Sequence, residues 1–324
     1  YGSWGSEMCI RDSPTNAIAV VFPKNTGELS SIMKVCFENN QKILVQGGLT
    51  NLVGSTKTFK DEIIVSLDRM NKIEEIDEKS RTITLQSGVI VEDAINAVNE
   101  KDLLLPLNFG AKGSAHIGGA ISTNAGGLRV LKYGMVRQMI LGLEVVLPDG
   151  RIVSSLKKII KDNSGYDLKQ FFIGSEGTLG IVTKAVLKLI EAPSTRHSAI
   201  LGVNDYESVI DLLKTLEKGL GGTLSAFELM WGNTYRTMIE KSTSLISPID
   251  QNYDYYVFVE TLGSNKNQDL SLLQNLIEKA LEDNIVYFYT PNDLIEKFGD
   301  TQNIQNKIRI GGLVLEKSIK KYQK

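Results

Sequence analysis

The chain has 324 residues, of which 42% are hydrophobic, and its 36 basic and 38 acidic residues leave a formal net charge of −2. This length and apolar content predict two folded domains and argue against a disordered chain. The balanced charge excludes an electrostatic surface for nucleic acid, and no apolar stretch approaches the ~20 residues of a membrane-spanning helix. Two cysteines give no disulfide framework.

The first elements of the chain follow a β-α-β order. Residues 1–13 show neither helical nor strand periodicity, and we interpret them as foreign to the fold or, alternatively, as a disordered native tail. A strand at 18–22 leads to a helix for which Thr26 is the expected N-cap. Strands at 42–46 and 62–67 complete the unit. The loop that follows the strand at 42–46 is a candidate binding loop, because α/β sheets bind ligands at the carboxyl ends of their strands.

The run 110–127 is the strongest local signal. It follows two short strands, 72–77 and 81–87, and a helix near 91–100, and it holds six glycines in eighteen residues. Glycine leaves backbone N–H groups uncovered for a ligand, but it equally favours sharp turns at a barrel corner. Of the 29 glycines in the chain, 13 fall between residues 110 and 180. This concentration favours the ligand cradle.

The rest of the chain predicts a hairpin and a second domain. Segments 141–147 and 151–155 flank a Pro-Asp-Gly turn, and a strand at 183–189 alternates apolar residues with lysines, which predicts one buried face and one solvated face. Pro193 marks the expected domain boundary. The order βαββαβ after it is typical of a ferredoxin-like fold, which we expect to be C-terminally incomplete in this chain.

Few side chains point to chemistry on their own. The fingerprints G-x-G-x-x-G and G-x-x-x-x-G-K-[ST] are absent, and two histidines and two cysteines show no metal-ligand spacing, so no metal site is expected. His116 is as compatible with a hydrogen bond to a cofactor as with a structural role, and His197 is expected at the solvated surface. Arg309 and Lys324 are read either as solvated cations or as partners of a substrate carboxylate.

Seven spaced motifs resemble, in order, those of FAD-linked oxidases of the vanillyl-alcohol oxidase type. They are Gln46-Gly-Gly-Leu-Thr-Asn-Leu-Val-Gly54, Gly110-Ala-Lys-Gly-Ser-Ala-His-Ile-Gly-Gly119, Ser122-Thr-Asn-Ala-Gly-Gly127, Lys132-Tyr-Gly134, Leu141-Gly-Leu-Glu-Val-Val-Leu147, Gly165-Tyr-Asp-Leu168 and Gly174-Ser-Glu-Gly-Thr-Leu-Gly180. The resemblance implies an α+β fold in which a two-subdomain PCMH-type FAD-binding domain covers 14–193. A partial ferredoxin-like cap domain for the substrate follows over 194–324.

The same resemblance implies the cofactor site. The residues expected to bind FAD are Gln46, Gly47, Gly48, Leu49, Thr50, Asn51, Leu52, Gly110, Gly113, Ser114, His116, Ile117, Gly118, Gly119, Thr123, Asn124, Gly126, Gly127, Gly180 and Ile181. Some relatives attach FAD through a histidine in the first of these loops. Because residues 47–55 contain no histidine, non-covalent FAD is expected.

Within the family, the Ala-Lys-Gly-Ser-Ala-His variant, with Leu224-Ser-Ala-Phe-Glu228 and Glu260-Thr-Leu-Gly-Ser-Asn265, looks most like the D-2-hydroxyglutarate dehydrogenases. The implied reaction is oxidation of a D-2-hydroxy acid to the 2-oxo acid by hydride transfer to flavin N5. By position, Arg309 and Lys324 match cations that hold the substrate carboxylates. No Glu-His-Gly stretch occurs, so we expect the catalytic base and a metal site beyond Lys324 and assign no catalytic residue.

Two alternatives stay open. One keeps the chemistry with D-lactate or glycolate as substrate, and the other is a flavin-binding electron-transfer subunit without its own substrate site. The expected partners are a small 2-hydroxy acid, an external electron acceptor and a second copy of the chain in a homodimer. The expected compartment is the cytoplasm, with the mitochondrion as the alternative that relatives suggest.

Overall fold

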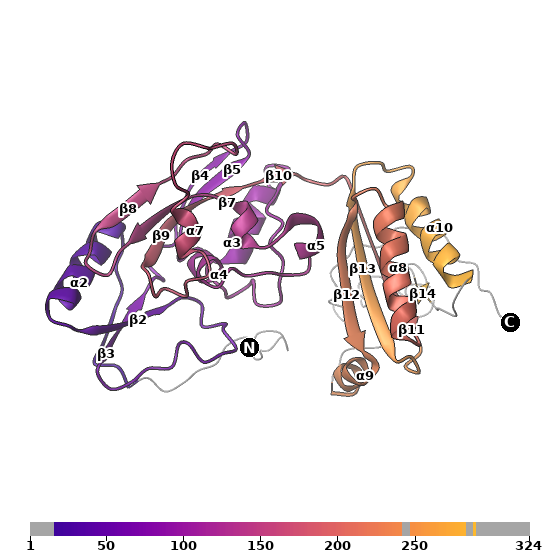
Figure 1. Cartoon of the computed structure of the whole chain (residues 1–324), viewed down its shortest axis with the longest axis horizontal. Coiled ribbons are helices and arrows are strands. Elements are labelled where there is room, and N and C mark those ends of the chain that lie inside the picture. Colours follow the sequence, from indigo (N-terminus) through magenta and orange to yellow (C-terminus); the bar gives the residue numbers. More distant parts are fainter. Residues whose placement is uncertain (1–15, 242–246, 283–287, 290–324) are drawn as a thin grey trace. The chain divides into compact units, whose positions relative to one another are not determined.

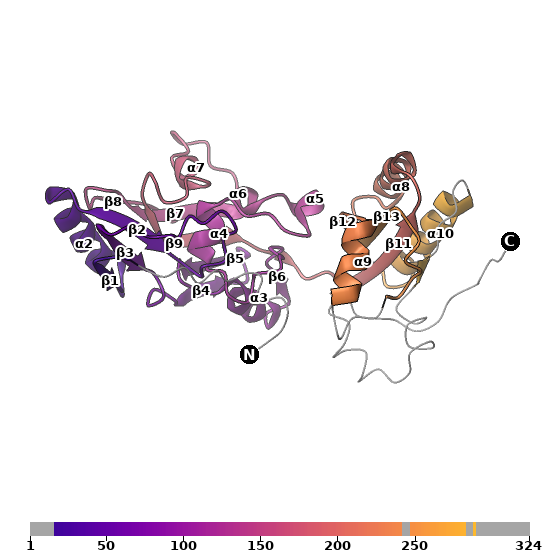
Figure 2. The same ribbon diagram turned by 90° about the horizontal axis from the view of Figure 1, so that it is seen from below.

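The computed structural model describes residues 16–241, 247–282 and 288–289. The described chain forms two compact units, whose elements are labelled in Figures 1 and 2. The first unit ends at Ala192 and the second begins at Pro193, and Val130–Lys132 also belong to the second unit. Each unit has a hydrophobic core of its own.

The first unit begins with a small parallel sheet of order β1-β3-β2, as the β-α-β pattern predicted. Its elements are β1 (Ala19–Val21), α2 (Thr26–Glu38), β2 (Lys42–Gln46) and β3 (Glu62–Ser66). The predicted cap of α2 is wrong by one residue. The Asn25 side chain accepts a hydrogen bond from the Glu28 amide at 2.9 Å, whereas the Thr26 hydroxyl donates to Glu144 Oε1 at 2.6 Å. The Thr26 hydroxyl binds the Glu144 carboxylate, which is 118 residues further along the chain, and the local sequence does not reveal this contact.

A five-stranded antiparallel sheet of order β4-β5-β9-β7-β8 forms the larger part of this unit. Its strands are β4 (Ile73–Asp77), β5 (Thr82–Gln86), β7 (Ile140–Val146), β8 (Ile152–Ser155) and β9 (Ile181–Lys188). The predicted hairpin is confirmed, since β7 pairs with β8. The predicted solvated face of β9 is only partly right, because Val182 and Val186, on the face of Lys184 and Lys188, are 3% and 0% exposed. Lys184 itself pairs with Glu74 at 3.0 Å.

Short helices and one strand pair complete the first unit. They are α3 (Val91–Asn99), β6 (Leu103–Leu104), α4 (Ile117–Ser122), α5 (Val130–Tyr133, of which Val130–Lys132 belong to the second unit), α6 (Val136–Met139), α7 (Lys169–Phe172) and β10 (Ile190–Glu191). Helix α4 lies next to β9, and its residues Ile117 and Ile121, one turn apart, are 1% and 0% exposed. Burial of these two side chains holds α4 on the core and leaves its opposite side at the surface.

The second unit is an antiparallel sheet of order β12-β13-β11-β14, with α8 and α10 on one face (Figures 1 and 2). Its elements are β11 (Thr195–Val203), α8 (Tyr206–Gly219), β12 (Leu224–Trp231), α9 (Gly232–Lys241), β13 (Tyr255–Gly263), α10 (Asp269–Glu282) and β14 (Phe288–Tyr289). The expected α+β class is thereby confirmed, and the βαββαβ order is present with one additional helix, α9, between β12 and β13. Helix α9 was not predicted, because it begins with glycine and buries only Tyr235 among its larger side chains.

Candidate cofactor site

The loop that follows β2 makes a close backbone contact with the glycine run. A Cβ placed on Gly48 would lie 1.9 Å from the carbonyl oxygen of Ser114, so only glycine allows this approach. The next residue, Leu49, has a left-handed backbone with φ of 55°. The expected binding loop 47–51 therefore meets residues 114–116, which are distant in sequence.

His116 lies against this loop from inside the unit. The side chain is 8% exposed, and a Cβ on Gly47 would be 3.5 Å from the Cβ of His116. Its Nε2 atom is 3.8 Å from Asp68 Oδ1, while Nδ1 is buried and has no hydrogen-bond partner among the described residues. Burial lowers the pKa of His116, and the Asp68 charge opposes that effect. The imidazole is therefore neutral near pH 7 and keeps one ring nitrogen unsatisfied beside the loop.

Two buried histidines predict a pH-dependent stability. Burial also lowers the pKa of His197, which is 7% exposed, so the expected surface position of His197 is wrong. A lowered folded pKa means that the unfolded chain takes up protons at higher pH than the folded chain. Stability is therefore complete above the ordinary value of 6.5 and falls as the pH drops below it. Urea titrations from pH 7.5 to 5.5 should show a smaller loss for His116→Gln and His197→Gln than for the unchanged chain, and equal losses would contradict this.

The glycine run continues into α4, where two backbone amides are already used by the fold. The Ile117 amide donates to the Val89 carbonyl at 2.9 Å and the Gly118 amide to the Ser87 carbonyl at 2.7 Å. A Cβ on Gly118 would lie 2.7 Å from the Ser87 Cβ, so this glycine serves packing. Gly119 is different: it is exposed, and a Cβ there would meet no atom within 4 Å. An open surface on α4 is thus present at Gly119, with Thr123 exposed one turn further on.

The segment 174–180 closes against the C-terminal end of α4. The Gly174 amide donates to the Ile121 carbonyl at 3.1 Å, and the Glu176 amide donates to the Ser122 carbonyl at 2.8 Å. Gly177 has φ of 80°, and a Cβ on it would be 4.0 Å from Val45 of β2. Three segments, 47–51, 110–127 and 174–180, therefore meet in the first unit.

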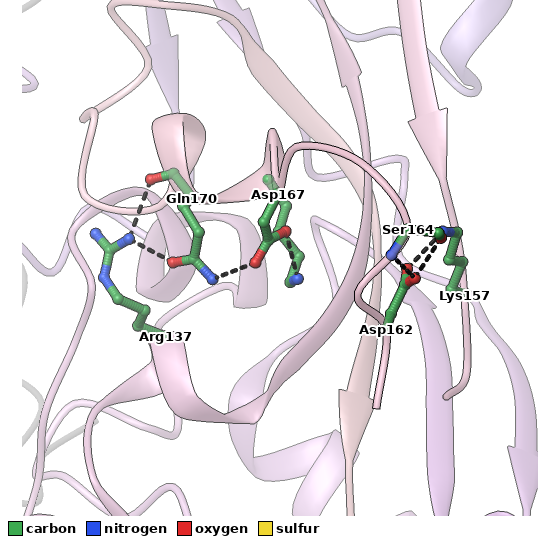
Figure 3. A network of polar contacts seen from close by, with 7 residues as sticks. Arg137, Lys157, Asp162, Ser164, Asp167 and Gln170 are labelled. Carbon is green, nitrogen blue, oxygen red and sulfur yellow. Dashed lines mark hydrogen bonds and ion pairs between the residues drawn. The ribbon is translucent and has the colours of Figure 1, made fainter. Parts of the chain in front are cut away.

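Arg137 on α6 connects the segment 110–127 to residues 170 and 173, which precede the segment 174–180, and the sequence does not single it out. Its guanidinium donates to the Gln170 carbonyl at 3.0 Å, to Gln170 Oε1 at 2.7 Å and to the Ile173 carbonyl, and its backbone amide donates to Asn124 Oδ1 at 3.0 Å. Figure 3 shows the guanidinium beside Gln170, whose amide nitrogen donates in turn to Asp167 at 3.0 Å. The only signal in the sequence is an arginine in a short helix next to the motif Lys132-Tyr-Gly134.

A second polar group in Figure 3 stiffens the loop before α7. The Ser164 hydroxyl donates to Asp162 Oδ1 at 2.6 Å, and the Lys157 ammonium binds the other carboxylate oxygen. These contacts lower the pKa of Asp162 well below its usual range, the contact with Lys157 being the larger cause. These exposed contacts link Lys157, Asp162 and Ser164 within the loop.

Replacing Arg137 by methionine is expected to destabilise the first unit by about 2 kcal/mol. The substitution keeps the apolar stem and removes a charged donor from three acceptor oxygens. Chemical unfolding measures the loss. The matched control is Arg81→Met, whose ion pair with Glu191 is exposed on both sides and should change stability by less than about 0.5 kcal/mol. Equal effects of the two substitutions would show that Arg137 is not a structural clamp.

The other predicted residues of the first unit lie around these segments. The Gln46 side chain donates to the Thr56 carbonyl and the Asn51 side chain to the Thr56 hydroxyl, both at 3.1 Å, so both shape the loop that contains Thr50 and the exposed Leu52. A Cβ on Gly127 would lie 2.1 Å from the Asn108 carbonyl oxygen, which fixes the chain after α4.

Five further predicted residues lie in the core or in loops of the first unit. Ile181 is 3% exposed in the core, and a Cβ on Gly180 would lie 2.7 Å from Val145, so both serve packing. Gly126 lies in the loop after α4. Gly110 and Gly113 lie in the turn before Ser114, and a Cβ on Gly110 would meet no atom within 4 Å.

The predicted substrate cations, Arg309 and Lys324, lie outside the described residues. Among residues 16–241, 247–282 and 288–289, no three His, Cys, Asp or Glu side chains are grouped so that they could hold a metal ion. No helix in the described part of the chain is long and apolar enough to cross a membrane.

Two family models match the chain, one in each unit. The model for the FAD binding domain matches residues 17–155, and the model for the C-terminal domain of FAD linked oxidases matches residues 192–296. The chain belongs to the FAD-linked oxidase family. FAD as the cofactor and the resemblance drawn from the seven motifs are thereby confirmed.

Curated relatives of this FAD-linked oxidase extend well beyond the matched region. A protein of Schizosaccharomyces pombe, provisionally named a mitochondrial D-lactate dehydrogenase, is 45% identical over 264 residues, which are 82% of this chain and 50% of that protein. The mitochondrial D-2-hydroxyglutarate dehydrogenase of Danio rerio is 41% identical over 264 residues, 82% of this chain and 49% of that protein. The chain spans about half the length of these relatives.

Solved structures share the fold of this FAD-linked oxidase. Alkyldihydroxyacetonephosphate synthase has a TM-score of 0.69 at 19% identity, covering 89% of this chain and 56% of that protein. For p-cresol methylhydroxylase the TM-score is 0.65 at 16% identity, covering 89% of this chain and 60% of that protein. The PCMH-type architecture is therefore confirmed.

The geometry of the first unit fits FAD. A diphosphate is held by uncovered backbone amides, which a glycine loop such as 47–48 provides, and a flat ring needs a surface without a Cβ, which Gly119 provides. The unsatisfied Nδ1 of His116 lies beside the same loop. The glycine-rich surface of these segments thus suits a cofactor that combines a planar ring system with a diphosphate.

Proposed function

We propose that the protein containing this chain is an FAD-dependent dehydrogenase of D-2-hydroxy acids, with D-2-hydroxyglutarate as the substrate and 2-oxoglutarate as the product. The contacts of the segment 110–127 with the segments 47–51 and 174–180 support the cofactor part of this proposal. The substrate part is supported by the names of relatives such as the Danio rerio enzyme.

The roles of the residues follow from their positions. When bound, FAD supplies an acceptor for the two electrons of the substrate C–H bond. The backbone of Gly47–Asn51 would hold the diphosphate, and the exposed side of α4 at Gly119 would support the cofactor without covalent attachment. His116 is neutral and positions the loop. Its buried Nδ1 accepts a hydrogen bond when the proton is on Nε2 and donates one when the proton is on Nδ1.

We further propose the partners and the compartment. An external electron acceptor reoxidises the flavin, and the chain associates as a homodimer. The sequence alone predicts the cytoplasm. The word mitochondrial in the names of the relatives favours the mitochondrion instead.

D-lactate or glycolate is the second candidate substrate. The observation that favours D-lactate is the name of the Schizosaccharomyces pombe relative, which is 45% identical to this chain. The electron-transfer subunit without its own substrate site is the third candidate, and no contact in the described residues favours it over an enzyme.

Anaerobic reduction of the bound flavin tests these candidates without knowledge of the electron acceptor. The purified holoprotein is mixed with D-2-hydroxyglutarate, L-2-hydroxyglutarate, D-lactate or glycolate, and loss of the flavin absorbance is followed by stopped flow. Rapid bleaching by D-2-hydroxyglutarate and not by its L-enantiomer supports the proposal. Preferential bleaching by D-lactate or glycolate would transfer the assignment to the second candidate. Bleaching by dithionite alone would favour the subunit.

A further inference from the structure

A buried carboxylate fixes an arginine at one end of the sheet of the second unit. Glu260 on β13 is 0% exposed and accepts a hydrogen bond from Arg196 Nε of β11 at 2.7 Å. The hydroxyl of Ser225 on β12 donates to the other oxygen of Glu260 at 2.8 Å. Three adjacent strands therefore contribute to one polar cluster, which we call the Arg196 cluster (Arg196, Ser225 and Glu260).

The cluster lies on the sheet face opposite α8 and α10. Ala199 of β11 and Val259 of β13 are cross-strand partners and pack with these helices. Side chains alternate along a strand, so Ser198 and its cross-strand partner Glu260 point to the other face, as does Arg196. Polar groups thus gather on the face that carries neither long helix.

The two Nη groups of Arg196 have no hydrogen-bond partner among the described residues. The Arg196 side chain is 37% exposed, and neither Nη1 nor Nη2 forms a hydrogen bond with any described residue. Nε alone is engaged with Glu260, which leaves the donors of both Nη groups for another acceptor. A guanidinium held in this way presents the pair of donors that matches the two oxygens of a carboxylate.

Two polar groups, the Ser198 hydroxyl and the Lys132 ammonium, lie close to the cluster. The hydroxyl oxygen of Ser198 is buried and has no hydrogen-bond partner within the described ranges. Burial lowers the pKa of Lys132, which belongs to the same unit and donates to the Leu262 carbonyl at 2.7 Å, and the charges of Asp269 and then Glu260 oppose that effect. The charge of Glu260 thus acts on Lys132 as well as on Arg196.

We infer that Arg196 binds a carboxylate of the substrate through its Nη groups, with Glu260 and Ser225 as positioning residues. This inference rests on the proposed function and deepens it, since a dicarboxylic 2-hydroxy acid requires a cation for the carboxylate remote from the reacting carbon. A monocarboxylic substrate has no such group. Arg196 is then a determinant of specificity for the dicarboxylate.

Calorimetric titration of the holoprotein with glutarate and with butyrate tests the inference without turnover. The principal variant is Arg196→Lys, which keeps a positive charge for Glu260 and loses the paired donors. A second variant, Arg196→Gln combined with Glu260→Gln, removes both charges and avoids leaving a buried carboxylate unpaired. The control is Arg81→Gln in the first unit, which breaks an exposed pair with Glu191.

We expect glutarate to bind at least tenfold more weakly to both Arg196 variants, while butyrate and the control are unchanged. The KM for D-2-hydroxyglutarate should rise by the same factor with little change in the KM for D-lactate. Unchanged glutarate affinity in a folded variant, or no glutarate binding by the unchanged protein, would overturn the inference. Glutarate binding that depends on Arg196, without flavin reduction by D-2-hydroxyglutarate, would instead refute the proposed function and leave the carboxylate site in place.

Discussion

Replacing Gly48 by alanine is expected to destabilise the first unit by more than about 3 kcal/mol and to abolish FAD binding. A methyl carbon on Gly48 would lie 1.9 Å from the Ser114 carbonyl oxygen and 3.0 Å from the Cα of Ala115. Both neighbours are backbone atoms, so no side-chain rotation relieves the contact. The two segments have to separate, and the surface that they form together is lost.

The adjacent residue provides a matched control. A Cβ on Gly47 would make an ordinary contact of 3.5 Å with the Cβ of His116, so Gly47→Ala should change the stability by less than about 1 kcal/mol. Chemical unfolding of the apoprotein and the flavin content after purification measure the two effects. If Gly48→Ala were as stable as Gly47→Ala, the contact between residues 48 and 114 would not be a feature of the folded protein.

The parts of the site that the sequence predicts are those in which glycine is required for steric reasons. Gly48, Gly118 and Gly127 each place a Cα within contact of a distant segment, and a run of such residues is visible in a single sequence. Spacing alone did not show which glycines serve packing and which leave an open surface. That distinction depends on the segment across the contact, and here only the structure separates Gly118 from Gly119.

The parts that the sequence does not predict depend on polar partners far along the chain. Arg137 binds oxygens on residues 170 and 173, and nothing in its own helix marks it as different from a solvated arginine. In the same way, His197 follows a proline and an arginine, yet it is buried, since it shares the sheet face of Ala199 and Leu201, which α8 and α10 cover. The order of most helices and strands was predictable because periodicity is local, whereas these contacts are long-range.

Replacing Gly119 by alanine is expected to lower the affinity for FAD at least tenfold, or about 1.4 kcal/mol, while leaving the apoprotein as stable as before. The added methyl group meets no protein atom within 4 Å, and alanine favours a helix by up to about 1 kcal/mol over glycine. Any loss therefore comes from the cofactor and not from the fold. Gly119→Leu should reduce the affinity further, because its side chain fills more of the same space.

The control for the Gly119 variants is Gly27→Ala, an exposed glycine in the first turn of α2. It carries a similar gain in helix propensity and lies outside the three segments of the candidate site. Fluorescence titration of the apoprotein with FAD gives the affinities, and thermal unfolding without FAD gives the stabilities. Equal FAD affinity in Gly119→Leu and Gly27→Ala would place the flavin elsewhere. A loss of FAD affinity confined to the Gly119 variants, with unchanged stability of the apoprotein, would separate cofactor binding from folding at a single residue. The Gly48 variant cannot make that separation, because its side chain meets the protein before it could meet the cofactor.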